Sequence, residues 1–127
     1  MTQDIPGLAA LRELLVGQEV SAVCFVRDYV ELHFDGPVVR ALTDPFGLYG
    51  CQPWRFPDGQ ALTLMRGYIG EVVDGFVLIP DEYAQLSFGE HSFTIPLDEQ
   101  SRESVEALHI VGVDQDGRTD ARHMWIY

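Results

Sequence analysis

The chain repeats one pattern of apolar residues, glycines and turn residues, and this internal repeat constrains the fold more than any other feature. Residues 11–42 align with residues 64–97 when the offset between the two copies grows from 53 to 55 residues. The matched pairs are Gly17 and Gly70, Val20 and Val73, Asp28 and Asp81, Tyr29 and Tyr83, Leu32 and Leu86, Phe34 and Phe88, and Leu42 and Leu97. A repeat of this kind predicts two similar structural units.

Each copy is expected to begin with a short helix that ends at a glycine. In the first copy, Asp4 suits the N-cap and Pro6 suits the first turn, and Gly17 supplies the stop. In the second copy the helix includes Gly67 and ends at Gly70. The residues spaced to share one helix face are Leu8, Leu11 and Leu15 in the first copy and Ala61, Leu64, Met65 and Tyr68 in the second.

Three strands joined by tight turns are expected after each glycine. The expected strands cover residues 20–26, 29–34 and 38–42 in the first copy and residues 72–79, 83–88 and 92–97 in the second. Asp35-Gly36 and Gly89-Glu90 predict two-residue hairpin turns. Pro80-Asp81 predicts a type I turn, with proline at its second position.

These patterns predict a single α+β domain made of two pseudo-twofold-related repeats of helix plus three-stranded antiparallel meander, with a C-terminal β-hairpin. The first repeat covers about residues 5–43, an aromatic linker residues 44–59, the second repeat about residues 60–98, and a C-terminal segment residues 99–127. The expected core consists of Leu11, Leu15, Val23, Phe25, Leu32 and Phe34, together with Leu64, Tyr68, Phe76, Leu78, Leu86 and Phe88.

The charge balance is the one outlier in the composition. Twenty acidic residues against eight basic residues give a net charge of −12. Such a field repels nucleic acid and anionic membranes, and it attracts a basic protein partner. The alternative is that the charge serves solubility alone. The start of the chain lacks a signal-peptide pattern, and its only cysteines, Cys24 and Cys51, do not suggest a disulfide framework, so a cytoplasmic location is expected.

The linker is the best candidate for a binding surface. It contains Tyr49, Trp54 and Phe56 among several prolines and glycines, and such aromatic side chains dominate recognition sites. The alternative is that these rings fold back as a lid over one end of the core. A binding surface and a lid therefore both remain open for residues 44–59.

The acidic segment after the second repeat is the second candidate surface. Glu99, Glu103 and Glu106 lie in residues 98–106, where a short helix starting at Ser101 is expected. Homodimerisation through an exposed tryptophan loop or a free edge strand is a related expectation.

The final hairpin carries two histidines whose relation depends on the turn. A two-residue turn at Asp116-Gly117 pairs His109 with Met124, whereas a three-residue loop sets His109 opposite His123. Residues 112–123 fail as a calcium loop, because glycine and histidine occupy ligand positions 1 and 12. No metal site and no cofactor are therefore predicted.

Catalytic patterns are sparse. Glu31 and His33 share the wetter face of one strand as an acid–base pair, but the second copy has Gln85 and Ser87 there, so a polar surface explains both. The chain has no nucleophile elbow, phosphate-binding glycine loop or zinc-protease helix motif. An enzyme is the less favoured interpretation.

The stretches 16–23 and 28–36, read with Glu106-Ala107 and the terminal Trp125, resemble a bacterial family of small two-repeat domains of unknown function. The resemblance implies a repeated leucine-rich turn, glycine and meander, and it implies no activity or catalytic residues. Residues 44–59 lie outside that family pattern. Small acidic proteins of this kind invite an analogy with immunity proteins against secreted toxins.

Two functions follow as hypotheses. The first is a non-catalytic, immunity-like binding module that presents an acidic surface to a basic protein partner. The second is a small-molecule-binding protein or enzyme with a pocket under residues 44–59. An exposed Trp54 favours the first hypothesis, and a Trp54 that forms the wall of a cavity favours the second.

Overall fold

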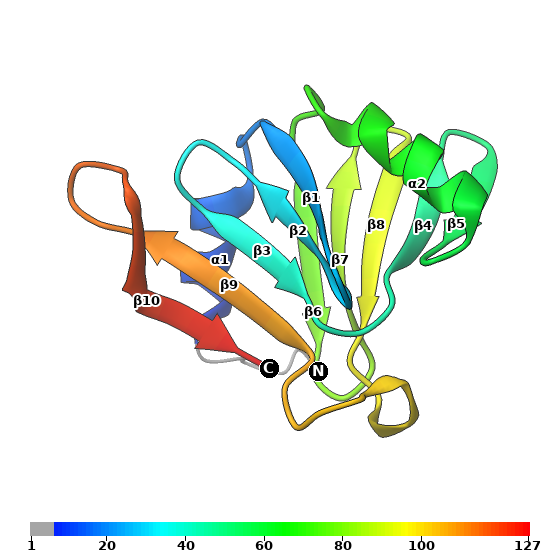
Figure 1. Ribbon diagram of the computed structural model, residues 1–127. Helices are drawn as coiled ribbons and strands as arrows, with labels where there is room; N and C mark the ends of the chain where they lie inside the picture. Colours follow the sequence, from blue (N-terminus) through cyan, green and yellow to red (C-terminus); the bar gives the residue numbers. More distant parts are fainter. Residues whose placement is uncertain (1–6) are drawn as a thin grey trace, which may run out of the picture.

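The computed structural model of the protein describes residues 7–127, in which two antiparallel five-stranded sheets pack face to face around one core (Figure 1). The first sheet has the order β1 (Ala22–Val26), β2 (Tyr29–His33), β3 (Val38–Ala41), β9 (Leu108–Val113) and β10 (Thr119–Ile126). The second sheet has the order β5 (Gln52–Arg55), β4 (Phe46–Tyr49), β8 (His91–Pro96), β7 (Tyr83–Phe88) and β6 (Gly75–Ile79). The α+β class predicted from the sequence is confirmed.

The helical elements are short. They are α1 (Leu8–Leu15), α2 (Gly59–Met65) and two 3-10 turns, Arg66–Tyr68 and Glu99–Ser101. None of the helices in residues 7–127 has the length and apolar composition needed to cross a membrane.

The turns inside each meander set the strand register. Asp35-Gly36 and Gly89-Glu90 both form two-residue hairpin turns, as predicted, with Phe34 opposite Pro37 and Phe88 opposite His91. The type I turn predicted at Pro80-Asp81 is wrong, because Asp81 has a φ of 63° and a type I turn requires a negative φ there. The Asp81 conformation is the one that a type II turn uses at its third residue.

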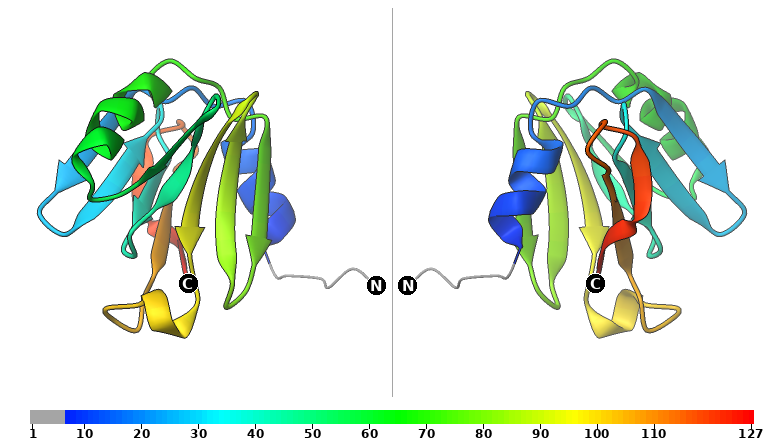
Figure 2. Two further views of the ribbon diagram at one scale, coloured as in Figure 1. Left: turned by 90° about the vertical axis from the view of Figure 1, so that its right-hand side faces the viewer. Right: turned by 90° about the vertical axis from the view of Figure 1, so that its left-hand side faces the viewer.

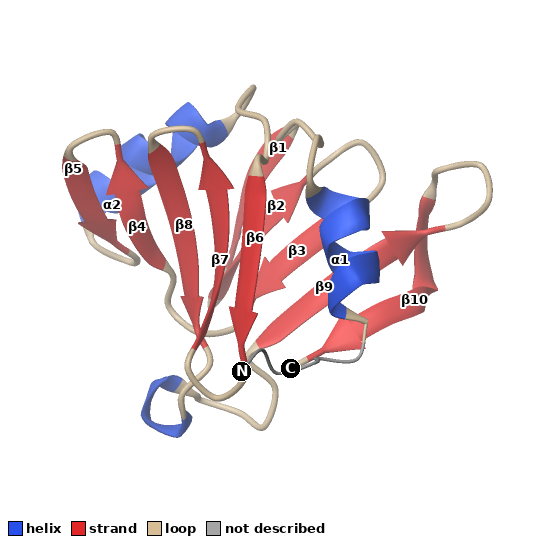
Figure 3. Ribbon diagram, turned by 180° about the vertical axis from the view of Figure 1, so that it is seen from behind, coloured by secondary structure: helices blue, strands red, loops and turns tan. Residues whose placement is uncertain are grey.

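Residues 44–59, predicted as an aromatic linker, contain the β4–β5 hairpin. The hairpin follows the first meander in the chain, yet β4 pairs with β8 of the second. The predicted C-terminal hairpin is β9–β10, which follows the second meander but pairs with β3 of the first and so extends that sheet. Each sheet therefore combines strands from both halves of the chain (Figures 1 and 3).

The two halves also meet where their leading glycines lie. Glu19 and Val72 form an antiparallel bridge. Gly17 N–H donates to the Val73 carbonyl and Gly70 N–H to the Val20 carbonyl, both at 2.8 Å. Two further hydrogen bonds, from Val20 N–H to the Glu71 carbonyl and from Val73 N–H to the Gln18 carbonyl, are both 2.9 Å long. These four bonds form two equivalent pairs. Adding 53 to the residue number from the first half, and subtracting 53 from the one in the second half, turns one bond of each pair into the other.

The helices α1 and α2 lie at opposite ends of the pair of packed sheets (Figure 2). On α1, Leu11 and Leu15 are fully buried, and the Arg12 Nε donates to the Phe76 carbonyl of β6 at 3.1 Å. The helix begins at Leu8, whereas the predicted capping residues Asp4 and Pro6 lie outside the described residues. The second helix is shorter than expected, because the chain tightens into a 3-10 turn before Gly67.

Most of the predicted core is buried, and the exceptions lie near its edge. Phe25, predicted to be buried, is 43% exposed because β1 is an edge strand, where its ring stacks on Phe56 with centroids 6.3 Å apart. Val23 and Leu64 are half-buried and pack against the core. The remaining predicted core residues are buried: Leu11, Leu15, Leu32, Phe34, Tyr68, Phe76, Leu78, Leu86 and Phe88.

Candidate functional site

A hollow of about 510 Å³ lies beside the β4–β5 hairpin. Phe46 and Leu48 alternate with the buried Gly47 along β4, so their side chains project into this cleft, where they are 36% and 46% exposed. Arg55 lies opposite Phe46 on β5, with its guanidinium 5.6 Å from the centre of the Phe46 ring. The remaining polar lining comes from Asp58, Gln60, Gln85, Ser92 and Thr94.

Gly47 lets β4 pack closely on the residues behind the cleft. A Cβ on residue 47 would lie 2.2 Å from the Ser92 carbonyl oxygen and 2.8 Å from Cζ2 of Trp54. Because glycine leaves this space free, the Trp54 ring packs against the backbone of β4, and Trp54 is among the cleft-lining residues although it is only 5% exposed. The backbone and a buried ring thus form part of the cleft wall.

A hydrogen-bonded aromatic cluster supports that wall. Trp54 Nε1–H donates to the Tyr68 hydroxyl at 2.9 Å, and the Tyr68 hydroxyl is 2.5 Å from the Ser92 carbonyl oxygen that accepts from it. Burial raises the pKa of Tyr68 to about 12, against the opposing effect of the Trp54 hydrogen bond. Tyr49 stacks on His91 with ring centroids 4.1 Å apart and donates to the Gly67 carbonyl.

The predicted aromatic site residues are therefore placed on the inner side of the hairpin. Trp54 and Phe56 are buried and Tyr49 is half-buried, so the rings fold back onto the core, as the lid alternative expects. Trp54 also forms a cavity wall. The residues of this segment that face outward, Phe46, Leu48 and Arg55, were not singled out from the sequence, although the alternation around Gly47 is a signal for them.

The acidic segment, residues 98–106, forms a loop that hydrogen bonds of its own side chains hold in place. The helix expected from Ser101 is instead the 3-10 turn Glu99–Ser101, capped by Asp98, whose Oδ2 accepts from Ser101 N–H at 3.2 Å. The Arg102 guanidinium donates to the Leu97 carbonyl at 2.9 Å and also to the Val105 carbonyl. Val105 itself is 90% exposed.

The three predicted glutamates of this segment have different surroundings. Glu99 and Glu103 are exposed, whereas Glu106 is half-buried, with its carboxylate 2.6 Å from His109 Nε2. Glu103 lines a second hollow of about 410 Å³ together with Asp44 and Arg102. This hollow shares Phe46 and Arg55 with the first cleft, so the structure brings Glu103 and the hairpin together at one continuous surface.

The final hairpin does not bring its two histidines together. His109 pairs with Ile126, because the register of β9 and β10 shifts between Asp120 and Met124. Next to the turn the strands have the register of the three-residue loop, with Val113 opposite Thr119. The irregularity further along the strands then moves His109 away from His123, so neither partner predicted for His109 is correct. The Asp114 carboxylate accepts the backbone N–H groups of Asp116 and Arg118, each at 2.9 Å, as a side chain does in a hairpin turn.

A second polar arrangement lies on the outer face of the first sheet. Cys24 is opposite Glu31, Glu31 opposite Arg40, and Arg40 opposite His109, so four neighbouring strands contribute one row of polar side chains. Arg40 Nε donates to Glu31 Oε2 at 2.8 Å, and His33 Nε2 lies 3.0 Å from Glu31 Oε1. Partial burial favours a higher pKa for Glu31, but the hydrogen bonds and charges of Arg40 and His33 outweigh it, so the pKa is lowered.

Two members of this row could have been found from the sequence. The two-residue turns at Arg27-Asp28 and Asp35-Gly36 place Cys24 and Arg40 opposite Glu31. The Arg40–His109 contact spans 69 residues of sequence and needed the tertiary structure.

Comparison with known proteins adds no relative. No protein-family model matches the chain, and neither the curated proteins nor the solved structures contain a match.

Proposed function

We propose that the protein is a non-catalytic, immunity-like binding module that recognises an extended segment of a basic protein partner. The segment lies in the cleft beside the β4–β5 hairpin and continues into the hollow next to it. The observation that carries this proposal is an exposed apolar pair, Phe46 and Leu48, beside the carboxylates of Asp44 and Glu103. An apolar side chain of the partner packs on the pair, and a neighbouring lysine or arginine pairs with the carboxylates.

The overall charge supports this choice of partner. At −12, the protein attracts a basic partner over a distance and repels nucleic acid and anionic membranes. The cleft is open, and a strand at the edge of the sheet lies next to it, which suits an extended peptide.

Random peptides displayed on phage test the proposal. Selection on the wild-type protein should enrich peptides that combine an aromatic or aliphatic residue with lysine or arginine. Leu48→Asp should weaken binding of these peptides by at least about tenfold, since a charge then replaces the apolar contact. Glu103→Gln should also weaken peptide binding and should make the binding less dependent on salt concentration. Val77→Asp is the matched control, because Val77 is an exposed valine on β6 outside the cleft. Equal loss in the Leu48 and Val77 variants would refute the cleft as the site.

A small-molecule site in the same cleft is the second candidate, and the buried position of Trp54 in the cleft wall favours it. We rank the protein partner first because Phe46 and Leu48 are exposed in the cleft. Arg55 lines the cleft and makes no ion pair within the described residues, and a volume near 510 Å³ lies in the range of small-ligand pockets. Arginine would pair with a carboxylate of such a ligand. Titration with small aromatic carboxylates and their amides distinguishes the two candidates. A small-molecule site should bind the carboxylates more tightly than the amides. Arg55→Gln should abolish carboxylate binding, whereas Glu103→Gln should leave it unchanged.

We also propose that the chain is an internal duplication in which each half gives its hairpin to the other half's sheet. The reciprocal hydrogen bonds around Glu19 and Val72 support it, as does the offset of 53 residues between β1 and β6. If the two halves have a common origin, a single rotation by 180° superposes β1–β3 on β6–β8. The same rotation then also superposes β9–β10 on β4–β5. Strands that fail to coincide under that rotation would contradict the duplication.

A further inference from the structure

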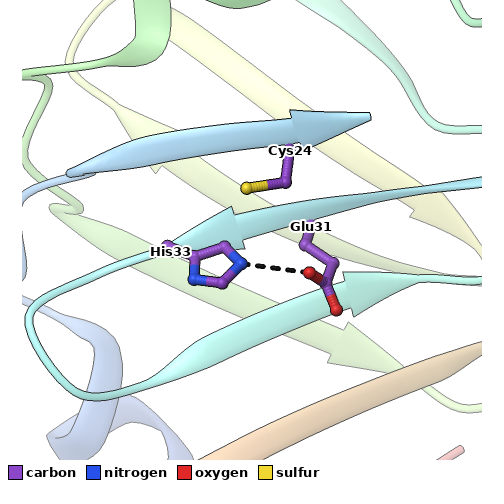
Figure 4. A group of neighbouring side chains, drawn as sticks. All are labelled: Cys24, Glu31 and His33. Atoms are coloured by element: carbon purple, nitrogen blue, oxygen red, sulfur yellow. Dashed lines mark hydrogen bonds and ion pairs between the residues drawn. The ribbon is translucent and has the colours of Figure 1, made fainter. Parts of the chain in front are cut away.

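Three side chains with metal-binding atoms converge on the outer face of the first sheet. Cys24 on β1 lies directly opposite Glu31 on β2, and His33 follows Glu31 by two residues on the same face. One atom of each, the thiol sulfur, a carboxylate oxygen and an imidazole nitrogen, lies within 4.8 Å of the other two. Figure 4 shows the thiol and the imidazole on the same side of the strands, with the Glu31 carboxylate beside the ring.

We propose that Cys24, Glu31 and His33 form a binding site for Zn²⁺. Sulfur, nitrogen and carboxylate oxygen are the donors that zinc uses in proteins, and a thiolate disfavours the hard cations Mg²⁺ and Ca²⁺. Binding replaces the 3.0 Å contact between His33 Nε2 and Glu31 Oε1 by bonds from both atoms to the metal. The Cys24 thiol binds as thiolate and its proton passes to solvent, and His33 binds as the neutral tautomer whose proton is on Nδ1.

The burial of the three groups suits a site that a metal can enter from solvent. The Glu31 side chain is 14% exposed, the His33 side chain is 35% exposed, and Cys24 is half-buried. Three protein ligands leave one position of a tetrahedral zinc open, and the exposure of His33 puts that position at the surface. One thiolate and one carboxylate supply two negative charges, which the dication shares with the guanidinium of Arg40.

Neighbouring residues hold the carboxylate in place for this role. Arg40 Nε binds Oε2 of Glu31 at 2.8 Å, which leaves Oε1 for the metal. Arg40 is in turn 3.0 Å from His109 Nδ1, and His109 Nε2 is 2.6 Å from Glu106 Oε2. A chain of outer contacts that orients a ligand in this way is typical of metal sites.

The second sheet shows that the meander does not need these three residues for folding. Val77 is paired with Gln85 across β6 and β7, as Cys24 is paired with Glu31, and Ser87 stands two residues beyond Gln85. None of the three is a usual zinc ligand. The donor set is therefore specific to the first sheet.

Cobalt titration of the whole protein tests the site, because Co²⁺ replaces zinc and reports thiolate ligation by its ultraviolet charge-transfer band. We expect one equivalent of Co²⁺ to give this band and Zn²⁺ to abolish it, while excess Mg²⁺ or Ca²⁺ leaves it unchanged. The band should be lost in Cys24→Ser and retained in Cys51→Ser, the matched change at the other free cysteine. Absence of the band in the wild type, or its persistence in Cys24→Ser, would overturn the proposal.

Calorimetric titration with Zn²⁺ tests the two other ligands. Glu31→Gln and His33→Gln should each weaken binding by at least about tenfold. His123→Gln is the control, because His123 on β10 lies beside Asp114, Asp116 and Asp120, a second group of side chains that could bind zinc weakly. Weakening in His123→Gln without weakening in His33→Gln would assign the metal to the C-terminal hairpin and overturn the proposal. Circular dichroism establishes that each variant is folded.

Discussion

At the scale of single residues, Tyr68 is the side chain on which the hairpin wall depends. It is fully buried, and its hydroxyl accepts a hydrogen bond from Trp54 Nε1 while lying within bonding distance of the Ser92 and Leu48 carbonyl oxygens. A buried donor such as the Trp54 N–H needs an acceptor, and Tyr68 supplies it. The residue thus joins the 3-10 turn after α2 to β4, β5 and β8.

Replacing Tyr68 by phenylalanine should lower the free energy of unfolding at pH 7 by about 1–3 kcal/mol, because the Trp54 N–H loses its acceptor. Urea denaturation measures the change. Tyr83→Phe is the control, since Tyr83 is half-buried and its hydroxyl makes no hydrogen bond within residues 7–127; we expect a change within about 0.5 kcal/mol. Equal stability of the two variants would contradict this role of Tyr68.

The same residue predicts a loss of stability at high pH. Burial raises the pKa of Tyr68 from 10.0 to about 12, so the unfolded chain releases this proton first. The contribution of Tyr68 is therefore complete below pH 10 and is lost as the pH rises through the folded-state pKa, by about 2–3 kcal/mol. In Tyr68→Phe the decline between pH 10 and 12 should be shallower than in Tyr83→Phe. Parallel pH profiles would refute this assignment.

At the scale of elements, the β4–β5 hairpin forms the cleft and also completes the second sheet. Its outward residues Phe46 and Leu48 line the cleft, and its inward residue Trp54 packs into the core. Gly47 makes both arrangements compatible, because only a residue without a side chain lets β4 approach the Ser92 backbone and the Trp54 ring.

We expect Gly47→Ala to destabilise the protein by about 1–3 kcal/mol or more, since its Cβ meets backbone that cannot move aside. The variant should also weaken binding in the cleft. Gly59→Ala is the matched control, because a Cβ there meets nothing within 4 Å and lies at the start of α2; it should be neutral or stabilising by about 0.5 kcal/mol. Thermal unfolding of both variants measures the difference, and a neutral Gly47→Ala would show that β4 can shift away.

At the scale of the whole molecule, the exchange of hairpins links the two halves of the chain. The first half cannot complete its sheet without β9 and β10, and the second half cannot complete its sheet without β4 and β5. The bridge between Glu19 and Val72 adds a direct backbone connection. Neither half of the chain can therefore unfold alone without leaving the sheet of the other half incomplete.

We accordingly predict one cooperative unfolding transition, which the two tryptophans can report. Trp54 lies on β5 of the second sheet and Trp125 on β10 of the first. In Trp125→Phe the fluorescence of Trp54 should have the same urea midpoint as circular dichroism, and in Trp54→Phe the fluorescence of Trp125 should do so too. A fluorescence midpoint that differs from the dichroism midpoint within one variant would indicate sheets that unfold separately.

The sequence by itself determined the features that depend on neighbouring residues. The glycines at 17 and 70 have φ values of 93° and 94°, as their role at the end of each helical segment requires. The two-residue turns Asp35-Gly36 and Gly89-Glu90 fixed the pairing of β2 with β3 and of β7 with β8. With strand pairing fixed, the alternation of side chains identified most of the core, because each of these effects acts over a few residues of backbone.

Only the tertiary structure decided which sheet each hairpin joins, and with it the cleft and the row from Cys24 to His109. The Leu48–Ser92 and Arg40–His109 contacts span 44 and 69 residues of sequence, and no local turn specifies them. They form because both hairpins bury apolar faces on a shared core, which is a property of the assembled sheets. The candidate sites depend on these distant pairings, and for that reason the residues that line them could not be read from the sequence as a set.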